Sequence, residues 1–161
     1  SSCFGAVYAE EEICGNGVDE DCNGVDLVIP DAYEPNNSCA SCYYLGEDPN
    51  IVLLPTTDNP YDVDYFCFDT NDSLSPLENI KVKLKDQPIG MDNDIFLYKG
   101  YEACEESDHI SASVTIGGQD ESLSWGEASL SDDGGLYIIR VQPYEASSCY
   151  MPYTLEINGL N

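Results

Sequence analysis

Positive charge is scarce in this sequence. Five Lys and Arg residues and one His stand against 31 Asp and Glu residues, so the formal net charge at pH 7 is −26. Proteins that bind nucleic acid neutralise its phosphates with clustered Lys and Arg, and proteins that dock on anionic lipid use the same residues. The composition therefore excludes nucleic acid as a partner and argues against docking on anionic lipid. So many like charges also repel one another in a compact chain, and divalent cations are the simplest relief.

Long apolar runs and catalytic side chains are scarce as well. No apolar run is long enough to cross a bilayer, so no membrane insertion is expected. Nucleophilic catalysis requires a base beside a Ser or Cys. The only histidine is His109, which follows Asp108 at the start of an expected strand and is interpreted as a surface residue. Nothing in the sequence marks a pair of catalytic carboxylates. We therefore expect no enzyme activity.

Cysteine, by contrast, is plentiful. Zinc sites use paired C-x-x-C units or histidines, and this chain has one C-x-x-C, Cys39 to Cys42, and one histidine. Disulfides are the better interpretation, and they predict an oxidising compartment and a secreted, extracellular protein. The eight cysteines expected to form them are Cys3, Cys14, Cys22, Cys39, Cys42, Cys67, Cys104 and Cys149.

The composition changes near Pro30. Residues 1–30 form an acidic segment rich in Gly and Cys, and residues 31–161 carry short runs of β-branched and aromatic residues between turn residues. We expect no helix and an antiparallel β-sandwich of seven or eight strands. The expected strands are Asn50–Leu54, Asp64–Thr70, Asn79–Asp86, Asp94–Gly100, Ile110–Ile116, Gly135–Gln142 and Tyr153–Gly159.

The acidic segment contains the first half of a calcium loop. Its residues 19–24, DEDCNG, fit the pattern D-x-[DN]-x-[DN]-G. Oxygens at alternate positions can converge on one hard cation, and the glycine permits the turn that brings the next carbonyl into reach. Pro30 occupies the position of the usual last glutamate, so that carboxylate must come from elsewhere. The candidate ligands are Asp19, Asp21, Asn23, the carbonyl of Val25, and either Asp26 or Asp31.

Cys14 and Cys22 lie close enough in sequence for a bridge that closes this loop. A ring of that size restricts the unfolded chain by roughly 2–3 kcal/mol. The stretch EICGNGVDEDCNGVD (Glu12–Asp26) resembles the MopE-type metal-binding motif, a Cys-bracketed acidic unit of secreted bacterial proteins. The resemblance implies a bound metal. Calcium is expected rather than copper, because the loop offers hard oxygens and neither His nor Met.

Five further stretches occur in order over about 130 residues: DAYEPNNSCASCYYLG, YDVDYFCFD, MDNDIFLY, GGLYIIRVQPY and YTLEI. This succession resembles the bacterial pre-peptidase C-terminal domain, a secreted β-sandwich related to the collagen-binding domains of collagenases. The resemblance implies a jelly-roll-like sandwich at the bacterial cell surface, no catalytic residues, and a calcium site near the N-terminal edge. By position it assigns ligand oxygens to Glu34, Asn36, Asn37 and Asp64. Two further acids of the family pattern fall on Ala32 and Tyr61, where Asp31 or Asp62 can stand in.

The remaining cysteines are expected to form disulfides that crosslink the sandwich. We expect Cys104 to pair with Cys149, and Cys39 or Cys42 to pair with Cys67, which leaves Cys3 to hold the N-terminal segment.

One expected strand carries three of the five basic residues. In IKVKLK, the apolar residues point one way, and Lys81, Lys83 and Lys85 point the other. The lysines either protect an edge strand against association or form a docking stripe for an acidic surface, such as another copy of the chain.

Two functions remain open at this stage. One is a calcium-stabilised extracellular structural protein that assembles with itself into a homo-oligomer, surface layer or filament. The other is a secreted module that binds an extracellular matrix polymer, protein or polysaccharide, as an accessory to a hydrolase.

Overall fold

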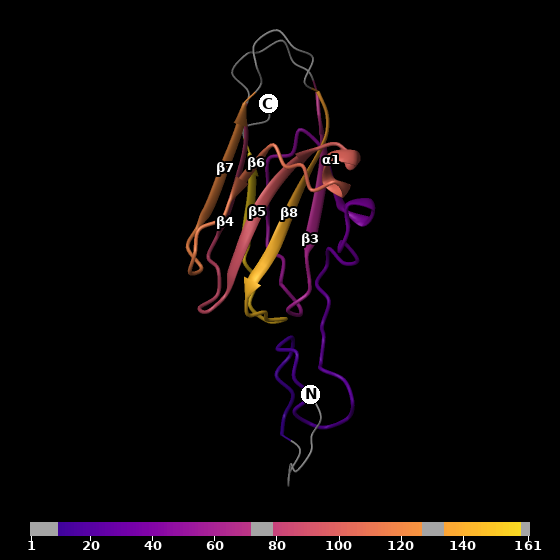
Figure 1. Cartoon of the computed structure of the whole chain (residues 1–161), viewed down its shortest axis with the longest axis vertical. Helices are drawn as coiled ribbons and strands as arrows, with labels where there is room; N and C mark the ends of the chain where they lie inside the picture. The colour runs from indigo at the N-terminus through magenta and orange to yellow at the C-terminus, as the bar shows by residue number, and fades with distance from the viewer. Residues whose placement is uncertain (1–9, 72–78, 127–133, 159–161) are drawn as a thin grey trace.

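The protein folds as a sandwich of two β-sheets, seen in Figure 1. The computed structural model describes residues 10–71, 79–126 and 134–158. In spatial order, the five-stranded sheet contains β1 (Tyr43–Glu47), β3 (Asp64–Thr70), β8 (Gly135–Glu145), β5 (Asp92–Lys99) and β6 (Ser111–Ser113). The four-stranded sheet contains β2 (Ile51–Leu53), β9 (Thr154–Asn158), β4 (Asn79–Lys85) and β7 (Glu121–Gly126). All neighbouring strands are antiparallel except β1 and β3, which are parallel.

The core lies between the sheets because successive residues of a strand face opposite ways. On β4, Ile80, Val82 and Leu84 are buried, and the lysines between them point outward. Phe66 and Phe68 of β3 are completely buried on the facing sheet. The sequence prediction of an all-β antiparallel sandwich is therefore confirmed.

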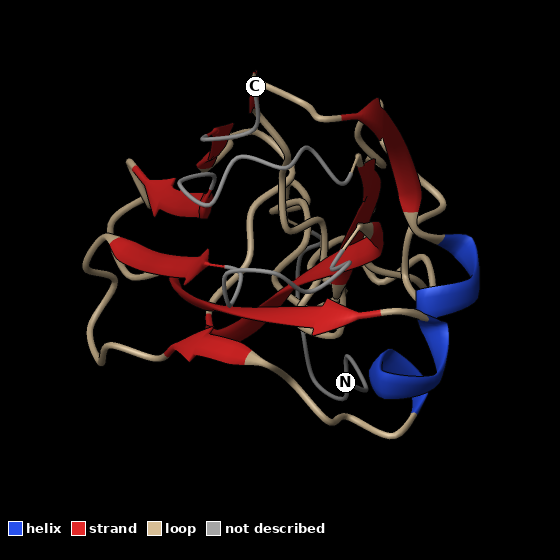
Figure 2. Ribbon diagram, turned by 90° about the horizontal axis from the view of Figure 1, so that it is seen from above, coloured by secondary structure: helices blue, strands red, loops and turns tan. Residues whose placement is uncertain are grey.

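The outer face of the five-stranded sheet carries a second, smaller layer. A short 3₁₀-helix, η1 (Cys39–Ser41), and a short α-helix, α1 (Tyr101–Glu105), lie side by side there (Figure 2). The expectation of no helix was wrong for these two pieces. Neither is long enough to display a helical period in its sequence. They cover Tyr98 and Ile138, whose side chains point away from the main core.

Seven of the observed strands correspond to expected ones, and two were missed. β1 has no clear apolar alternation, and its first residues are exposed. β7 alternates Ser with larger residues, so its average strand propensity is low, although Leu123 is buried in the core. β6 covers only the first part of the expected segment Ile110–Ile116.

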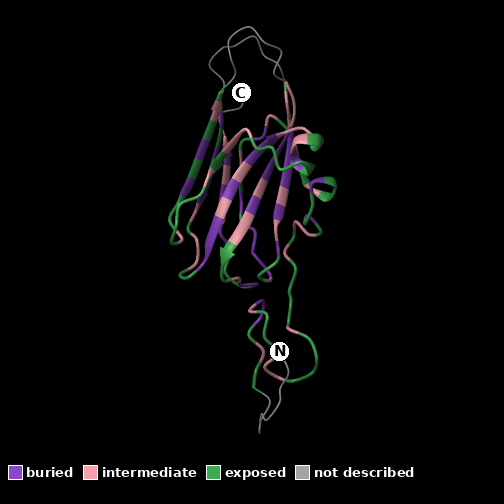
Figure 3. Ribbon diagram, in the orientation of Figure 1, coloured by how far each residue is buried: buried purple, intermediate pink, exposed green. Residues whose placement is uncertain are grey.

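The described part of the acidic segment lies beyond one end of the sandwich (Figure 1). Most of its residues are exposed or half-buried (Figure 3), and residues 10–38 contain no strand or helix. Among the described residues, no helix is long and apolar enough to cross a membrane.

Candidate metal centre

Three carboxylates meet at the N-terminal edge of the sandwich. One oxygen from each of Glu34, Asp62 and Asp64 lies within 4.8 Å of the other two. Asp64 opens β3, Asp62 lies in the loop before it, and Glu34 lies in the segment that leads to η1. Asp62 and Asp64 are 2% and 1% exposed, so their charges are almost completely removed from water.

Each carboxylate uses one oxygen to fix its position. Glu34 Oε2 accepts hydrogen bonds from the Asn36 backbone N–H (3.0 Å) and the Asn37 side chain (2.8 Å). Asp62 Oδ2 accepts from the Asp58 backbone N–H at 2.8 Å. Asp64 Oδ2 accepts from the hydroxyl of Tyr153, which precedes β9 of the other sheet. These bonds determine where the second oxygen of each carboxylate points.

The second oxygens are buried and have no hydrogen-bond partner. They are Glu34 Oε1, Asp62 Oδ1 and Asp64 Oδ1. The side chain of Asn36 is 0% exposed, and neither of its polar atoms has a partner of normal hydrogen-bond geometry, although it lies close enough to Asp64 to lower that pKa. Buried polar groups in proteins are nearly always satisfied. The oxygens of these four side chains could therefore hold a cation.

The pKa values point the same way. Burial, together with the charge of Asp64, raises the pKa of Asp62 to about 8. Burial raises the pKa of Asp64 to about 7, against the lowering effect of the Tyr153 hydroxyl. Two buried acids side by side disfavour ionisation. A bound divalent cation would reverse this balance, because it is the largest local charge at such a site.

The remaining predicted residues of this site make hydrogen bonds to the backbone and side chains around it. Asp31 accepts hydrogen bonds from the backbone N–H groups of Tyr33 and Thr56, both at 2.7 Å, so both of its oxygens are used. Asn37 donates to Glu34 and accepts from the Val63 N–H at 3.3 Å. Of the two possible stand-in acids, the structure brings Asp62 into the three-carboxylate group.

The acidic segment forms a different kind of cluster. Asp19 and Asp21 approach Glu12, a residue that was not among the predicted ligands, but all three are only half-buried. Both oxygens of Glu12 already accept backbone hydrogen bonds, from Asp21 (2.7 Å) and Leu27 (3.2 Å). Glu12 lies outside the calcium-loop spacing, and only the folded loop brings it close.

The other predicted ligands of this loop lie outside that cluster, and Asn23 and Asp26 make hydrogen bonds within the segment. Asp21 accepts from the Asn23 N–H at 2.9 Å, and Asn23 accepts from the Val25 N–H at 3.0 Å. Asp26 accepts from the Gly17 N–H at 2.8 Å. Such turns form with or without an ion.

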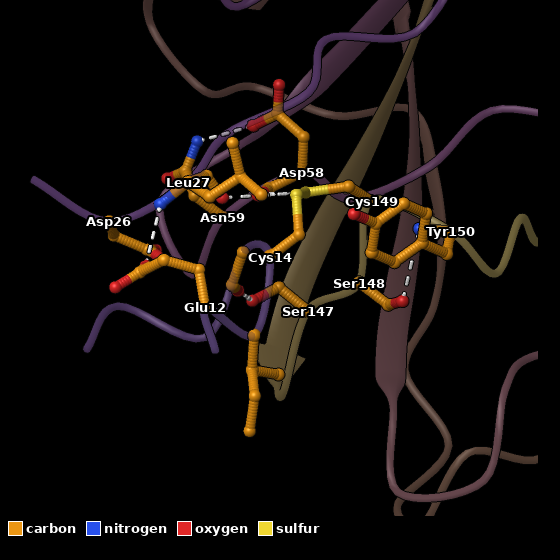
Figure 4. Close-up of a disulfide and its surroundings, with 12 residues drawn as sticks. Glu12, Cys14, Asp26, Leu27, Asp58, Asn59, Ser147, Ser148, Cys149 and Tyr150 are labelled. Atoms are coloured by element: carbon orange, nitrogen blue, oxygen red, sulfur yellow. Dashed lines mark hydrogen bonds between the residues drawn. A yellow bond between two sulfur atoms is a disulfide. The ribbon is translucent and has the colours of Figure 1, made fainter. Parts of the chain in front are cut away.

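The disulfides correct two expected pairings. Cys14 pairs with Cys149 and not with Cys22, because the acidic segment packs against the loop between β8 and β9 (Figure 4). The Gly15 N–H donates to the Leu27 carbonyl (2.9 Å), and the Ser147 hydroxyl donates to the Gly15 carbonyl. The acidic segment is thus held to the sandwich and does not close on itself through Cys14.

The expected pair Cys104–Cys149 was also wrong. Cys104 pairs with Cys39, because α1 and η1 lie together on the outer face. Of the two alternatives for Cys67, the structure has Cys42, which precedes the parallel strand paired with β3. Cys22 is disulfide-bonded as well, and the expectation for Cys3 lies outside the described residues.

The position of β4 tests one of the two interpretations of its lysines. β4 lies between β9 and β7, so the edge-strand interpretation was wrong. Lys85 forms an ion pair with Glu156 at 2.6 Å, while Lys81 and Lys83 are exposed.

The fold, rather than the sequence, connects this chain with known proteins. No protein-family model matches it, and neither does any curated protein sequence. Its structure is similar to that of the pre-peptidase C-terminal domain of a collagenase from Bacillus anthracis, with a TM-score of 0.50 and 15% identity. The match covers 71% of this chain and 92% of that domain.

The chain is therefore a disulfide-bonded β-sandwich with the pre-peptidase C-terminal fold. The fold predicted from the resemblance is confirmed, and the MopE-type motif stays a prediction. The described disulfides fit an extracellular protein.

Proposed function

We propose that this protein is a non-catalytic, extracellular structural module stabilised by calcium. The carrying observation is the convergence of buried, unpartnered oxygens from Glu34, Asp62 and Asp64 beside the buried amide of Asn36. Three carboxylates and one amide supply four of the six to eight oxygens that calcium takes. Water and backbone carbonyls can supply the rest.

The donor set favours calcium over other metals. All of its atoms are hard oxygens, which suit calcium, magnesium or manganese, and it contains no sulfur or imidazole for zinc or copper. Magnesium demands near-ideal octahedral geometry and keeps several of its own waters. A buried site built from protein oxygens suits the larger, less demanding calcium ion.

Binding at this place would join three parts of the molecule. Glu34 and Asn36 lie on the segment that enters the sandwich, and the Asn36 carbonyl accepts from the Tyr65 N–H at 2.9 Å. Asp64 belongs to one sheet and bonds to Tyr153 beside the other. Calcium would therefore stabilise the entry of the chain and the end of the sandwich together.

Calorimetric titration of calcium into calcium-free protein tests this proposal. We expect one site with a Kd of about 10⁻⁴ M or below. Asp62→Asn should weaken binding at least tenfold, whereas Asp108→Asn, which removes an exposed carboxylate elsewhere, should leave it unchanged. A wild-type protein that takes up no calcium at millimolar concentration would overturn the proposal.

Within this function we propose self-association, into a layer or filament at a bacterial cell surface, as the principal use. The separation of charge between the acidic segment and the lysines of β4 supports it. The alternative is a module that holds a matrix polymer beside a secreted hydrolase. It draws support from the similar solved structure, which is a domain of a collagenase. Retention on collagen, chitin or cellulose, but not on a control resin, would favour the alternative.

A further inference from the structure

The outer face of the four-stranded sheet is open. The helical pieces cover part of the other sheet, but every described residue that points outward here is exposed or half-buried. We call this surface the lysine face. Its members are Val52 of β2, Thr154, Glu156 and Asn158 of β9, Lys81, Lys83 and Lys85 of β4, and Ser122 and Ser124 of β7.

The lysine face is positive in a strongly negative protein. Its three lysines and one glutamate give a formal charge of +2, against −26 for the chain. Glu156 pairs with Lys85 at 2.6 Å, so the free charge lies at Lys81 and Lys83. Lys81 lies opposite Ser124 and Asn158, which are short and uncharged. Lys83 lies opposite Ser122 and Glu156, and the Glu156 carboxylate is paired with Lys85. The two ammonium groups are therefore accessible.

The fold gives these lysines no obvious structural task. β4 is an interior strand, so it needs no protection from edge association. Lysine is depleted in strands relative to β-branched residues. Like charges on one strand face also repel each other.

A surface of complementary character exists elsewhere on the same chain. Residues 10–29 carry seven acids and no Lys, Arg or His. They also expose six apolar side chains. These are Ile13, Val18, Val25, Leu27, Val28 and Ile29, which are between 39% and 66% exposed. The lysine face has an apolar border of the same kind, with Val52 57% and Leu54 58% exposed.

We propose that the lysine face receives residues 10–29 of a second copy of this chain. Acidic side chains would meet Lys81 and Lys83, and the exposed aliphatic residues would cover Val52 and Leu54. This inference rests on the self-association part of the proposed function and names its two surfaces. Because the two surfaces differ, the contact is heterologous, and such contacts propagate unless rotation closes a ring.

Paired charge reversals test this contact. The first variant, K81E/K83E, has an acidic face and a native acidic segment. The second, E10K/E11K, changes two exposed acids that have no described side-chain hydrogen bond, and it keeps the native face. Sedimentation velocity at low salt should show association of the wild type. Each variant alone should lose it, with apparent affinity reduced tenfold or more.

The mixture of the two variants distinguishes this contact from any other. The acidic segment of the first fits the lysine face of the second, and this contact is native on both sides. The segment of the second keeps five acids beside its two introduced lysines, so it remains negative and does not fit the acidic face of the first. An equimolar mixture should therefore form pairs of unlike variants through that one native contact, which neither variant makes alone. A symmetric contact made by one surface alone gives no such rescue. Added salt should weaken every association, because the charges are exposed.

The control is K99E, which changes the net charge as much as K83E but lies on β5 of the other sheet. It should associate like the wild type, whereas K83E should not. A monomeric wild type at low salt, an unrescued mixture, or equal effects of K83E and K99E would each overturn the inference. The inference would also be overturned if the wild type stayed monomeric and bound polygalacturonate, and if K83E abolished that binding. An acidic polysaccharide would then be the occupant of the lysine face.

Calcium titration of the same variants separates the two proposals. K81E/K83E should bind calcium like the wild type, because β4 contributes no residue to the metal centre. Normal calcium binding without association refutes the docking contact alone. Association without calcium binding refutes the metal centre alone.

Discussion

Among the described residues, two groups of three acids lie close enough together to hold an ion, and their surroundings differ. At the edge of the sandwich, Asp62 and Asp64 are almost fully buried, and each keeps one oxygen without a partner. In the acidic segment, Glu12, Asp19 and Asp21 are half-buried, and both Glu12 oxygens and one Asp21 oxygen accept backbone hydrogen bonds within the loop.

The contrast is a reason to rank candidate metal sites by burial and hydrogen bonding rather than by the number of carboxylates. An exposed acid is stabilised by water and loses little when no ion is present. A buried, unpartnered acid is costly without a counter-charge. Asp26 of the loop also has one buried oxygen without a hydrogen bond, but the three clustered acids of the loop are only half-buried. The loop with the better sequence motif is therefore the weaker candidate, and the less obvious group at the sandwich edge is the stronger one.

The two regions are also held in different ways. The acidic segment is tied to the sandwich by Cys14–Cys149, which joins residues 135 apart, whereas a bound ion would hold the sandwich edge. The double variant C14S/C149S should lose about 3–4 kcal/mol of unfolding free energy, since the other bridges already shorten the free loop. Chemical denaturation measures this loss.

Calcium binding of C14S/C149S separates the regions. Glu34, Asp62 and Asp64 lie outside the tethered segment, so calcium should still raise stability by the same increment as in the wild type. Loss of that increment in C14S/C149S would show that the two regions are coupled, and the comparison would fail.

Replacing one carboxylate of the metal centre should have the next largest effect on the unfolding free energy. The sign of this effect should depend on whether calcium is present. At a calcium concentration of 100 times Kd, binding stabilises the native state by about 2.7 kcal/mol. D64N should lose most of that gain. In calcium-free solution D64N should instead be as stable as the wild type or more so, because it removes a buried charge and still accepts from Tyr153. Thermal unfolding with calcium and with a chelator measures both effects. Equal destabilisation under both conditions would indicate a structural role without an ion.

The sequence was sufficient for the architecture but not for the neighbours of each strand. The alternation in IKVKLK correctly separates Ile80, Val82 and Leu84 from the lysines. It cannot say whether the strand lies at an edge, because strand order depends on long-range pairing. The missed strand β7 supplies the neighbour that makes β4 interior.

The site was predictable in part for the same reason. Glu34, Asn36 and Asp64 follow from the resemblance by position, but the choice between Asp31 and Asp62 needs geometry. Asp31 caps backbone N–H groups, and Asp62 points into the cluster. The disulfide pairings follow from contacts between η1, α1 and the β8–β9 loop, which sequence spacing does not encode.

The unfolding free energy of the calcium-free protein should depend on pH because of the buried acids Asp62 and Asp64. In the native state the pKa values are about 8 for Asp62 and about 7 for Asp64, against an ordinary value of 3.8. Between these limits the native state binds more protons than the unfolded state, so stability falls as pH rises from about 4 to about 8. Saturating calcium should oppose this fall, because the ion favours the ionised form.

Two variants with the same change in net charge can identify which acids cause this dependence of stability on pH. Self-repulsion of the whole acidic chain also destabilises it as pH rises. D62N/D64N should flatten the slope of unfolding free energy against pH, and D19N/D21N, which removes the same charge from the loop, should flatten it much less. Identical slopes in the two variants would assign the effect to net charge.

The smallest effect is expected in the acidic loop itself. Asp21 accepts from Asn23 and lies near Glu12 and Asp19, all half-buried or exposed, where surface substitutions usually change stability by no more than about 0.5 kcal/mol. D21N should therefore change the unfolding free energy by about that amount or less, with calcium or without it. Denaturation curves that nearly coincide with those of the wild type are the expected result. A calcium-dependent loss as large as that of D64N would place a second occupied site in the loop. The motif would then be the better guide, and the argument from burial would be wrong for this molecule.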